Sequence, residues 1–253
     1  MRRRCAHARC TEDGDLTDQA QKPNGLFITF EGGEGAGKTT HASFLANALI
    51  EHGYEVVRLR EPGGTTVGEQ LRAIVLDPAN TQLGIHTELL IYEAARAQIV
   101  CEVIKPALER GAVVLCDRFA DSTIAYQVYG RGLSLDEVMR ANEFACQGVW
   151  PDRTILLTTG STAQKGLTRA TLHHEADRLE LEGAAFHERV NAGFTRIAKE
   201  DPSRVRVVES AAAKSQTSKL IFEELSDLFP WMRELIDDKP EYFAPLDIRK
   251  AQK

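Results

Sequence analysis

The sequence has no long uncharged apolar run, so it predicts neither a transmembrane helix nor a secretory signal peptide. It also lacks an excess of positive charge. Its formal net charge of −6 argues against a general nucleic-acid-binding protein, because proteins that follow phosphate backbones are usually basic. Hydrophobic residues make up 43% of the 253 residues, which is enough for a sizeable core in one large domain or two small ones.

Cysteine is also scarce, and the five cysteines do not have the spacing of a disulfide framework. Cys101, Cys116 and Cys146 lie in apolar segments, so we expect them to pack as small buried side chains in a reducing cytoplasm. Cys5 and Cys10 match no zinc-binding pattern, and no second pair follows them.

The two ends of the chain differ from the part between them. Residues 1–22 change from basic to acidic with almost no apolar side chains, which predicts a disordered N-terminal extension. A transit peptide and a start codon assigned too early are alternative explanations. Residues 230–253 are charged and interrupted by proline, which predicts a loose C-terminal tail. The folded domain is therefore expected over residues 23–229.

A glycine-rich segment near the start of this domain fits the pattern G-x-x-x-x-G-K-[ST] of a phosphate-binding loop. The apolar run before it, residues 26–30, predicts a strand, and the helical spacing of Phe44, Leu45 and Leu49 after it predicts a helix. Such a loop directs backbone N–H groups at the phosphates of a nucleoside triphosphate. The predicted ATP-binding residues are Gly32, Gly33, Glu34, Gly35, Ala36, Gly37, Lys38, Thr39 and Thr40.

Strand-like runs alternate with helical patterns through the rest of the domain. The predicted strands lie near residues 26–30, 55–60, 112–116, 153–157 and 204–208. This alternation predicts an α/β protein with a five-stranded parallel sheet between two helical layers, the three-layer α/β/α fold of P-loop proteins. Ligands bind at the carboxyl ends of the strands in such sheets, so we expect functional residues there.

Two segments between the second and third predicted strands carry side chains suited to a nucleotide. A Pro-Gly-Gly turn over residues 60–65 brings Glu61 and Pro62 to the strand ends, with Arg72 on the next helix; an ordinary turn is the alternative. Tyr92 and Arg96 share one face of a helix near residues 87–109, and such a pair suits a base and its phosphate. Alternatively, they are a partly buried tyrosine beside an exposed arginine.

Asp117 and Arg118 follow the third apolar strand directly. An acid at this position of a P-loop enzyme holds Mg²⁺ or its water shell, and Thr39 would add a hydroxyl ligand. Arg118 suits bidentate contact with phosphates, although a structural Asp–Arg pair is the alternative.

The polar stretch over residues 169–182 predicts a short mobile lid. A zinc site is excluded, because His174-Glu175 would need a second histidine at the position of Arg178. The arginines of this stretch could close over the transferring phosphoryl group, with an ordinary solvated loop as the alternative for every residue except Arg178.

Taken together, these segments resemble the thymidylate kinase family. The matching segments are residues 31–40, the turn at 60–65, the Tyr92/Arg96 helix and Asp117-Arg118-Phe119-x-x-Ser122-x-x-Ala125-Tyr126-Gln127. The resemblance covers roughly residues 25–228 in unbroken order. It implies phosphoryl transfer from Mg·ATP to dTMP, giving dTDP, and suggests a homodimer. The net charge and the lack of a long apolar run predict no nucleic-acid or membrane partner.

By position, the resemblance also implies roles for individual residues. Tyr92, usually phenylalanine in the family, would stack on thymine, Arg96 and Gln127 would hydrogen-bond the base, and Arg72 and Arg118 would hold the monophosphate. The implied dTMP-binding residues are Glu34, Glu61, Pro62, Arg72, Tyr92, Arg96, Arg118, Ser122, Thr123, Tyr126 and Gln127. The implied catalytic residues are Lys38, Asp117, Arg118 and Arg178. The implied metal ligands are Thr39 and Asp117, partly through water.

Several positions depart from the family pattern. Gly35 stands where the eukaryotic type has arginine, which resembles the bacterial type with its lid arginines and makes Arg178 the leading candidate. Thr158-Thr159 replaces the usual Asp-Val, and Glu93 replaces a frequent alanine.

Other functions are left open by the sequence. The segment 117–127 and the turn at 60–65 argue against another nucleoside-monophosphate kinase, such as one for dUMP, dCMP or AMP. A GTP-dependent switch would need an Asn-Lys-x-Asp motif, which the sequence lacks. A nucleotide-binding scaffold without catalysis stays an alternative.

Overall fold

The computed structural model describes residues 25–160, 163–171 and 175–248. Its centre is a five-stranded parallel sheet in the order β2-β3-β1-β4-β5. The strands are β1 (Leu26–Glu31), β2 (Val56–Arg60), β3 (Val113–Asp117), β4 (Arg153–Thr158) and β5 (Val205–Glu209). The predicted sheet and its five strands are confirmed. Expectations for residues 1–22, including Cys5 and Cys10, lie outside the described residues.

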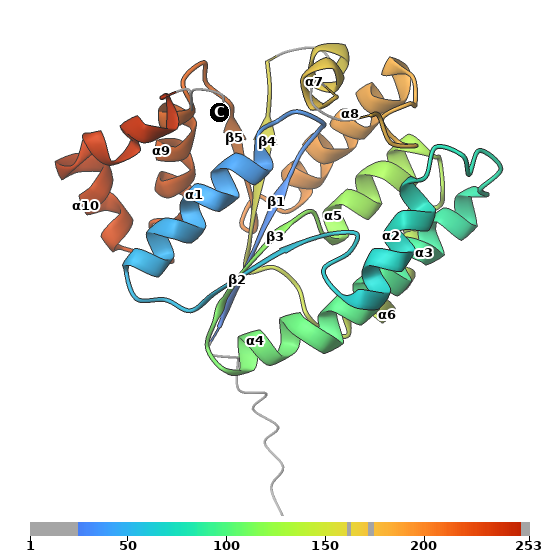
Figure 1. Ribbon diagram of the computed structural model, residues 1–253, viewed down its shortest axis with the longest axis horizontal. Helices are drawn as coiled ribbons and strands as arrows, with labels where there is room; N and C mark the ends of the chain where they lie inside the picture. The colour runs from blue at the N-terminus through green and yellow to red at the C-terminus, as the bar shows by residue number, and fades with distance from the viewer. Residues whose placement is uncertain (1–24, 161–162, 172–174, 249–253) are drawn as a thin grey trace, which may run out of the picture.

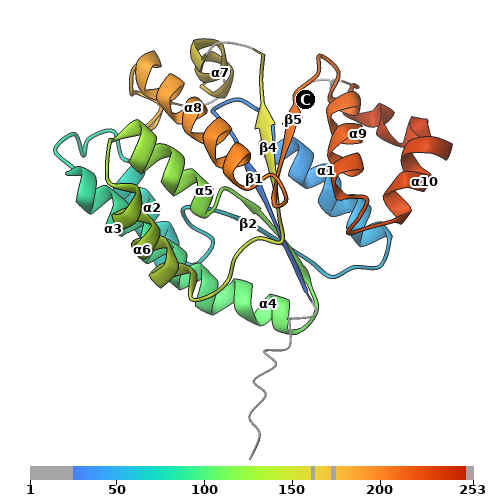
Figure 2. The same ribbon diagram turned by 180° about the vertical axis from the view of Figure 1, so that it is seen from behind.

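Helices cover both faces of the sheet, as the two views in Figures 1 and 2 show. One face carries α1 (Lys38–Glu51), α9 (Lys214–Leu225) and α10 (Trp231–Asp238). The other face carries α3 (Ile85–Ile99), α4 (Lys105–Glu109), α6 (Leu135–Cys146) and α8 (Ala184–Glu200). Helix α2 (Thr66–Leu76) packs against α3, α5 (Ala120–Thr123) against α6, and α7 (Ala163–Ala170) against α8. None of the helices in the described ranges is long and apolar enough to cross a membrane.

Alternation along the central strand explains the two covered faces. Ile28 and Phe30 of β1 pack under α1 and α9, whereas Phe27 faces α4 on the other side of the sheet, and all three are fully buried. Because successive side chains of a strand point to opposite faces, a strand buried on both sides has an unbroken apolar sequence. This burial fixes β1 at the sheet centre, so the loop that follows it leaves from the middle of the carboxyl edge.

The helix expected near residues 87–109 is interrupted. It consists of α3, the π-helical turn η1 (Val100–Ile104) and α4, and a second π-helical turn, η2 (Ile124–Gly130), follows α5. Such turns occur often at functional sites. The second one carries Tyr126 and Gln127, two of the predicted dTMP-binding residues.

The prediction of a loose tail from residue 230 is wrong for the residues described there. Helix α10 and the 3₁₀ turn η3 (Pro240–Leu246) pack on α1 and α9, and Met232 and Phe243 are fully buried. The charges dominate the composition of this segment, but its apolar residues recur at helical spacing and bury one face. The expectation for Cys101 is also wrong, because its side chain is exposed on η1.

Candidate active site

The loop between β1 and α1 has the geometry of a phosphate cradle. Gly37, at φ 93°, occupies the left-handed region just before α1, so the helix N-terminus opens toward the loop. Gly32 has φ 134°, and a Cβ there would lie 2.2 Å from the Leu157 carbonyl oxygen. Lys38 Nζ donates to the carbonyl oxygens of Gly32 and Gly33, at 3.1 and 3.0 Å, which curls the loop around the ammonium group. Burial lowers the pKa of Lys38, and the charge of Arg118 lowers it further.

Thr39 and Asp117 come together at the end of this loop. The Thr39 hydroxyl donates to Asp117 Oδ2 over 2.6 Å. A hydroxyl and a carboxylate are oxygen ligands of the kind Mg²⁺ uses, with water and substrate phosphates completing its coordination. Among the described residues, no group of three or more His, Cys, Asp or Glu side chains could hold a metal ion by itself. The pair therefore fits a Mg²⁺ ion that is bound mainly through a nucleotide.

Arg118 is held in a strained conformation beside the loop. Its φ of 71° is uncommon for any residue other than glycine and is found most often where function requires it. Its guanidinium donates to Glu34 Oε1 at 2.6 Å, to the Gly32 carbonyl at 3.1 Å and to Ser122 Oγ at 3.1 Å. The Tyr126 hydroxyl donates to the same Glu34 oxygen at 2.6 Å.

This arrangement determines the charge of Glu34. Burial alone would raise the pKa of its carboxyl, but the positive charges of Arg118 and Lys38 outweigh that effect and lower the pKa to about 2. Glu34 is therefore ionised and neutralises part of the positive charge of Arg118 and Lys38.

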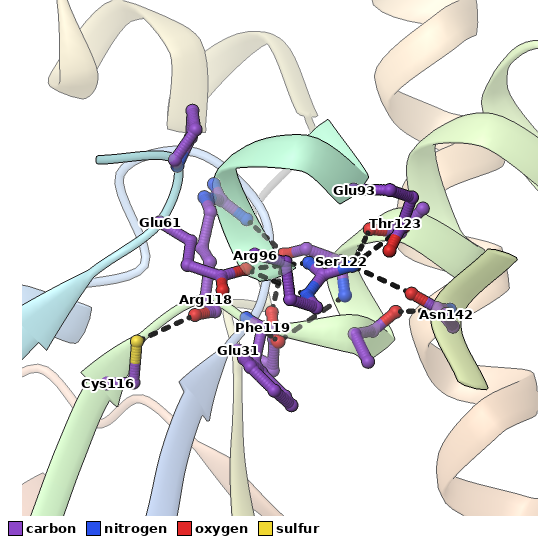
Figure 3. A network of polar contacts seen from close by, with 12 residues as sticks. Glu31, Glu61, Glu93, Arg96, Cys116, Arg118, Phe119, Ser122, Thr123 and Asn142 are labelled. Carbon is purple, nitrogen blue, oxygen red and sulfur yellow. Dashed lines mark hydrogen bonds and ion pairs between the residues drawn. The ribbon is translucent and has the colours of Figure 1, made fainter. Parts of the chain in front are cut away.

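Glu31, which the sequence analysis did not single out, supports this region from below (Figure 3). It is fully buried at the end of β1 and accepts hydrogen bonds from Phe119 N at 2.7 Å and Ser122 Oγ at 2.6 Å. Burial, together with the charge of Asp121, raises the pKa of Glu31 to about 8. An acid closing an apolar strand was the signal that could have identified it.

Arg96 is surrounded by protein groups (Figure 3). Its Nε and NH2 donate to Glu61 at 3.0 and 2.7 Å, and its NH1 lies 2.7–2.8 Å from Glu93, Thr123 and Asn142. Burial alone would lower its pKa, but the two carboxylates raise the pKa of Arg96 above its usual range. Glu93 and Asn142 enter this network although the sequence analysis assigned neither of them to the site.

A cavity of about 670 Å³ joins these groups, a volume typical of ligand sites. Its predicted lining residues are Glu34, Gly35, Ala36, Gly37, Lys38, Thr39, Thr40, Glu61, Pro62, Arg72, Tyr92, Arg96, Asp117, Arg118, Ser122, Thr123, Tyr126 and Gln127. Arg72 donates to the Pro62 carbonyl at 2.9 Å. The Tyr92 hydroxyl oxygen is buried and has no hydrogen-bond partner among the described residues. Gly32 and Gly33 line a smaller cavity of about 210 Å³ next to it.

The structure does not bring Arg178 to this cavity. Its Nε donates to the Val75 carbonyl at 2.8 Å, and its NH2 contacts Glu88 at 2.5 Å. In the described conformation its guanidinium is thus held by Val75 and Glu88, and its catalytic role stays a prediction. His173 and His174 of the expected lid lie outside the described residues.

Comparison with known proteins agrees with this geometry. The family model described as thymidylate kinase matches residues 30–221. The chain belongs to the thymidylate kinase family. It is 42% identical over 207 residues to a thymidylate kinase of Bacillus licheniformis, covering 81% of this chain and 95% of that protein. It is 46% identical over 198 residues to one of Gloeobacter violaceus, covering 78% and 92%.

A solved structure supports the same family assignment. The crystal structure of thymidylate kinase from Ehrlichia chaffeensis matches with a TM-score of 0.66 and 33% identity, covering 80% of this chain and all of that one. The match to the thymidylate kinase family ends at residue 221, before α10 and η3, so the packed C-terminal segment lies beyond the matched residues.

Proposed function

We propose that this cavity transfers the γ-phosphoryl group of ATP to dTMP, giving dTDP and ADP. The observation that carries the proposal is that one cavity joins a complete phosphate loop, with Lys38 and Thr39, to an aromatic and amide wall formed by Tyr92 and Gln127. Arg118 lies between the two halves. A donor nucleotide on the loop and an acceptor nucleotide against the wall would then direct their phosphates toward Arg118.

The chain's own groups suffice to position the phosphates and offset their charge. Phosphoryl transfer needs alignment and charge neutralisation more than covalent chemistry. Lys38 would contact the β- and γ-phosphates once they replace its present carbonyl partners. Arg118 can bridge two phosphate oxygens because its planar guanidinium donates bidentately. Thr39 and Asp117 would hold Mg²⁺, which would supply neutralisation of the phosphate charge when it is bound.

The acceptor side offers distinct contacts for base and phosphate. Tyr92 presents a ring for stacking, and Arg72 is a half-buried cation on the cavity wall that suits the monophosphate. Gln127 and Thr123 provide polar groups for the base. Arg96 already has four protein partners, so we assign it mainly to shaping this wall, with a contact to the base through its remaining donor capacity.

We further propose that the protein is a cytoplasmic homodimer. Helices α3 and α6 pack side by side and expose Leu90, Leu135 and Phe144, at 64%, 44% and 86%. Large apolar side chains left exposed on neighbouring helices are candidates for a protein–protein interface. The three cysteines in the described ranges are free thiols, which agrees with a reducing compartment.

An assay of ADP release would test the proposed reaction. Purified protein is given Mg·ATP with dTMP, dUMP, dCMP, dGMP or AMP as separate acceptors. We expect the highest kcat/KM with dTMP and a lower value with dUMP, since one methyl group in an apolar slot contributes about 1–3 kcal/mol. ATP binding without turnover of any acceptor would refute the proposed activity while leaving the fold intact.

A further inference from the structure

Glu88 is a buried acid behind the cavity wall and is not among the residues that line the cavity. It lies in the first turn of α3 and is 1% exposed. Its Oε1 accepts hydrogen bonds from Gln127 Nε2 at 2.9 Å and Arg131 Nε at 3.0 Å. Its Oε2 accepts from Arg131 NH2 at 3.0 Å and Arg178 NH2 at 2.5 Å. One carboxylate therefore holds both Gln127 of the cavity wall and Arg178 of the expected lid.

The charge state of Glu88 follows from these contacts. Burial alone would raise its pKa, but hydrogen bonds and charge from Arg131, with hydrogen bonds from Arg178 and Gln127, lower the pKa below its usual range. An ionised carboxylate accepts hydrogen bonds and donates none. The side-chain amide of Gln127 must therefore direct its N–H end toward Glu88.

The opposite end of that amide is the one available to a ligand. Gln127 lines the cavity although it is 1% exposed to solvent. Among the described residues, Gln127 Oε1 accepts no hydrogen bond. It is also not one of the fully buried polar atoms that lack a partner. The wall formed by Tyr92 and Gln127 thus offers the Gln127 carbonyl oxygen, and a base that hydrogen-bonds to this oxygen must supply a donor.

We propose that Glu88 is a positioning residue that selects the nucleobase by fixing the orientation of the Gln127 amide. The inference rests on the proposed function, which places a deoxynucleoside monophosphate against this wall. On thymine or uracil the only ring-edge donor is N3–H, because N1 is bonded to the sugar. On cytosine, N3 is an acceptor. Gln127 Oε1 therefore pairs with thymine N3–H and faces a second acceptor when cytosine takes the same place.

The test replaces the carboxylate by an amide of the same shape. In Glu88→Gln, the introduced amide can donate or accept, so the Gln127 amide can turn and present its N–H to the base. We expect the ratio of kcat/KM for dTMP to that for dCMP to fall by at least about tenfold, the size of effect expected for one hydrogen bond. A merely structural loss would lower both values together and leave the ratio unchanged.

The matched control is Glu182→Gln. Glu182 pairs with the same Arg131 at 2.5 Å, so this variant also removes a negative charge from that guanidinium without altering the Gln127 contact. Its dTMP/dCMP ratio should equal that of the unsubstituted protein. A ratio that falls equally in both variants would overturn the proposal.

A second variant keeps the inference testable if Glu88→Gln does not fold. Gln127→Leu removes the acceptor itself, so kcat/KM for dTMP should fall by at least about tenfold while that for dCMP changes less. Adding Glu88→Gln to it should not change the ratio further. An unchanged ratio in Gln127→Leu would overturn the assignment of Gln127 and Glu88 to base selection.

The unsubstituted protein separates this inference from the proposed function. If it turns over no dTMP with Mg·ATP, the proposed function fails and the inference fails with it. If it phosphorylates dTMP but Glu88→Gln leaves the ratio unchanged, the proposed function stands and only the inference fails.

Discussion

The hydroxyl of Thr39 donates to the carboxylate of Asp117 over 2.6 Å, although 78 positions separate the two residues in the chain. They meet because β1 and β3 are neighbouring parallel strands, whose carboxyl ends lie at the same edge of the sheet. The contact closes the phosphate loop onto the next strand and places a hydroxyl oxygen beside a carboxylate, the pair that we propose faces a metal-bound nucleotide.

Removing the Thr39 hydroxyl should weaken catalysis through the metal. We expect Thr39→Val to lower kcat/KM for Mg·ATP by about 10²-fold, because part of the charge stabilisation that a metal supplies is lost. Thr39→Ser keeps the hydroxyl and serves as the matched control, with activity close to that of the unsubstituted protein. Measuring rates across a Mg²⁺ titration would show a higher Mg²⁺ requirement for the valine variant alone. Equal Mg²⁺ dependence in both variants would argue against Thr39 as a ligand.

Glu34 should make the stability depend on pH in the acid range. Its pKa of about 2 in the folded protein lies below the ordinary value of 4.5. The ionised carboxylate therefore stabilises the fold above about pH 4.5, and this contribution is lost as the pH falls toward 2. The shift corresponds to about 3 kcal/mol at pH 7.

Urea unfolding of Glu34→Gln would check this expectation. The variant should have a lower free energy of unfolding at pH 7 and a shallower loss of stability between pH 4.5 and pH 3. The exposed Glu109→Gln serves as a control that should retain the steeper loss. Parallel acid profiles for Glu34→Gln and the unsubstituted protein would contradict the prediction.

The hydroxyl and the ring of Tyr92 should have separable effects. Because its buried oxygen has no partner among the described residues, Tyr92→Phe should leave the free energy of unfolding unchanged or raise it by about 1 kcal/mol. Tyr92→Ala removes the stacking surface and should raise the KM for dTMP by about tenfold or more, since base stacking contributes about 1–3 kcal/mol. A large rise in KM for the phenylalanine variant would show that the hydroxyl itself contacts the nucleotide.

The dimer proposal predicts that Phe144 lies at the interface. Introducing a charge by Phe144→Glu should shift the protein to a monomer in size-exclusion chromatography with light scattering. Val207→Glu adds the same charge at a half-exposed position on β5 and should leave the dimer intact. A monomeric unsubstituted protein, or a dimeric Phe144→Glu variant, would contradict the proposed interface.

The sequence was most informative where local pattern decides structure. The apolar runs predicted all five strands, and the spacing around Lys38 predicted the phosphate loop, because both depend on contacts close in sequence. The partners of Arg178 and Arg96 could not be predicted in this way. Glu88 is 90 positions from Arg178, and Asn142 is 46 positions from Arg96, so only the packing of distant helices brings them together.

The C-terminal segment was misjudged for a different reason. Its net composition is charged, yet Trp231, Met232 and Leu235 have the helical spacing of a buried face. Trp231 stacks on His52 with ring centroids 3.6 Å apart, a contact to a helix end far away in the sequence. The charged composition of the segment favours a loose tail, but the helical spacing of its apolar residues is the better guide to its structure.

Phe243 should therefore be important for stability. It is fully buried against Phe44 and Phe222, so Phe243→Ala should lower the free energy of unfolding by about 3–5 kcal/mol. Ile248→Ala, at a position 70% exposed, should change it by less than about 0.5 kcal/mol. Urea denaturation followed by circular dichroism would measure both. Equal stability of the two variants would mean that this segment does not contribute to the core.

The packing of this segment on α1 also affects the order in which the protein can fold during synthesis. Tyr242 donates to Glu51 at the end of α1, 191 positions earlier, and Phe243 contacts Phe44 in the same helix. A growing chain is made from its N-terminus, so the helix that opens at the phosphate loop is among the first elements to leave the ribosome. Part of its apolar face stays uncovered until the last turns have been translated. The apolar face of α1 is thus fully covered only after this late segment has been made, although none of the described residues that line the cavity belongs to it.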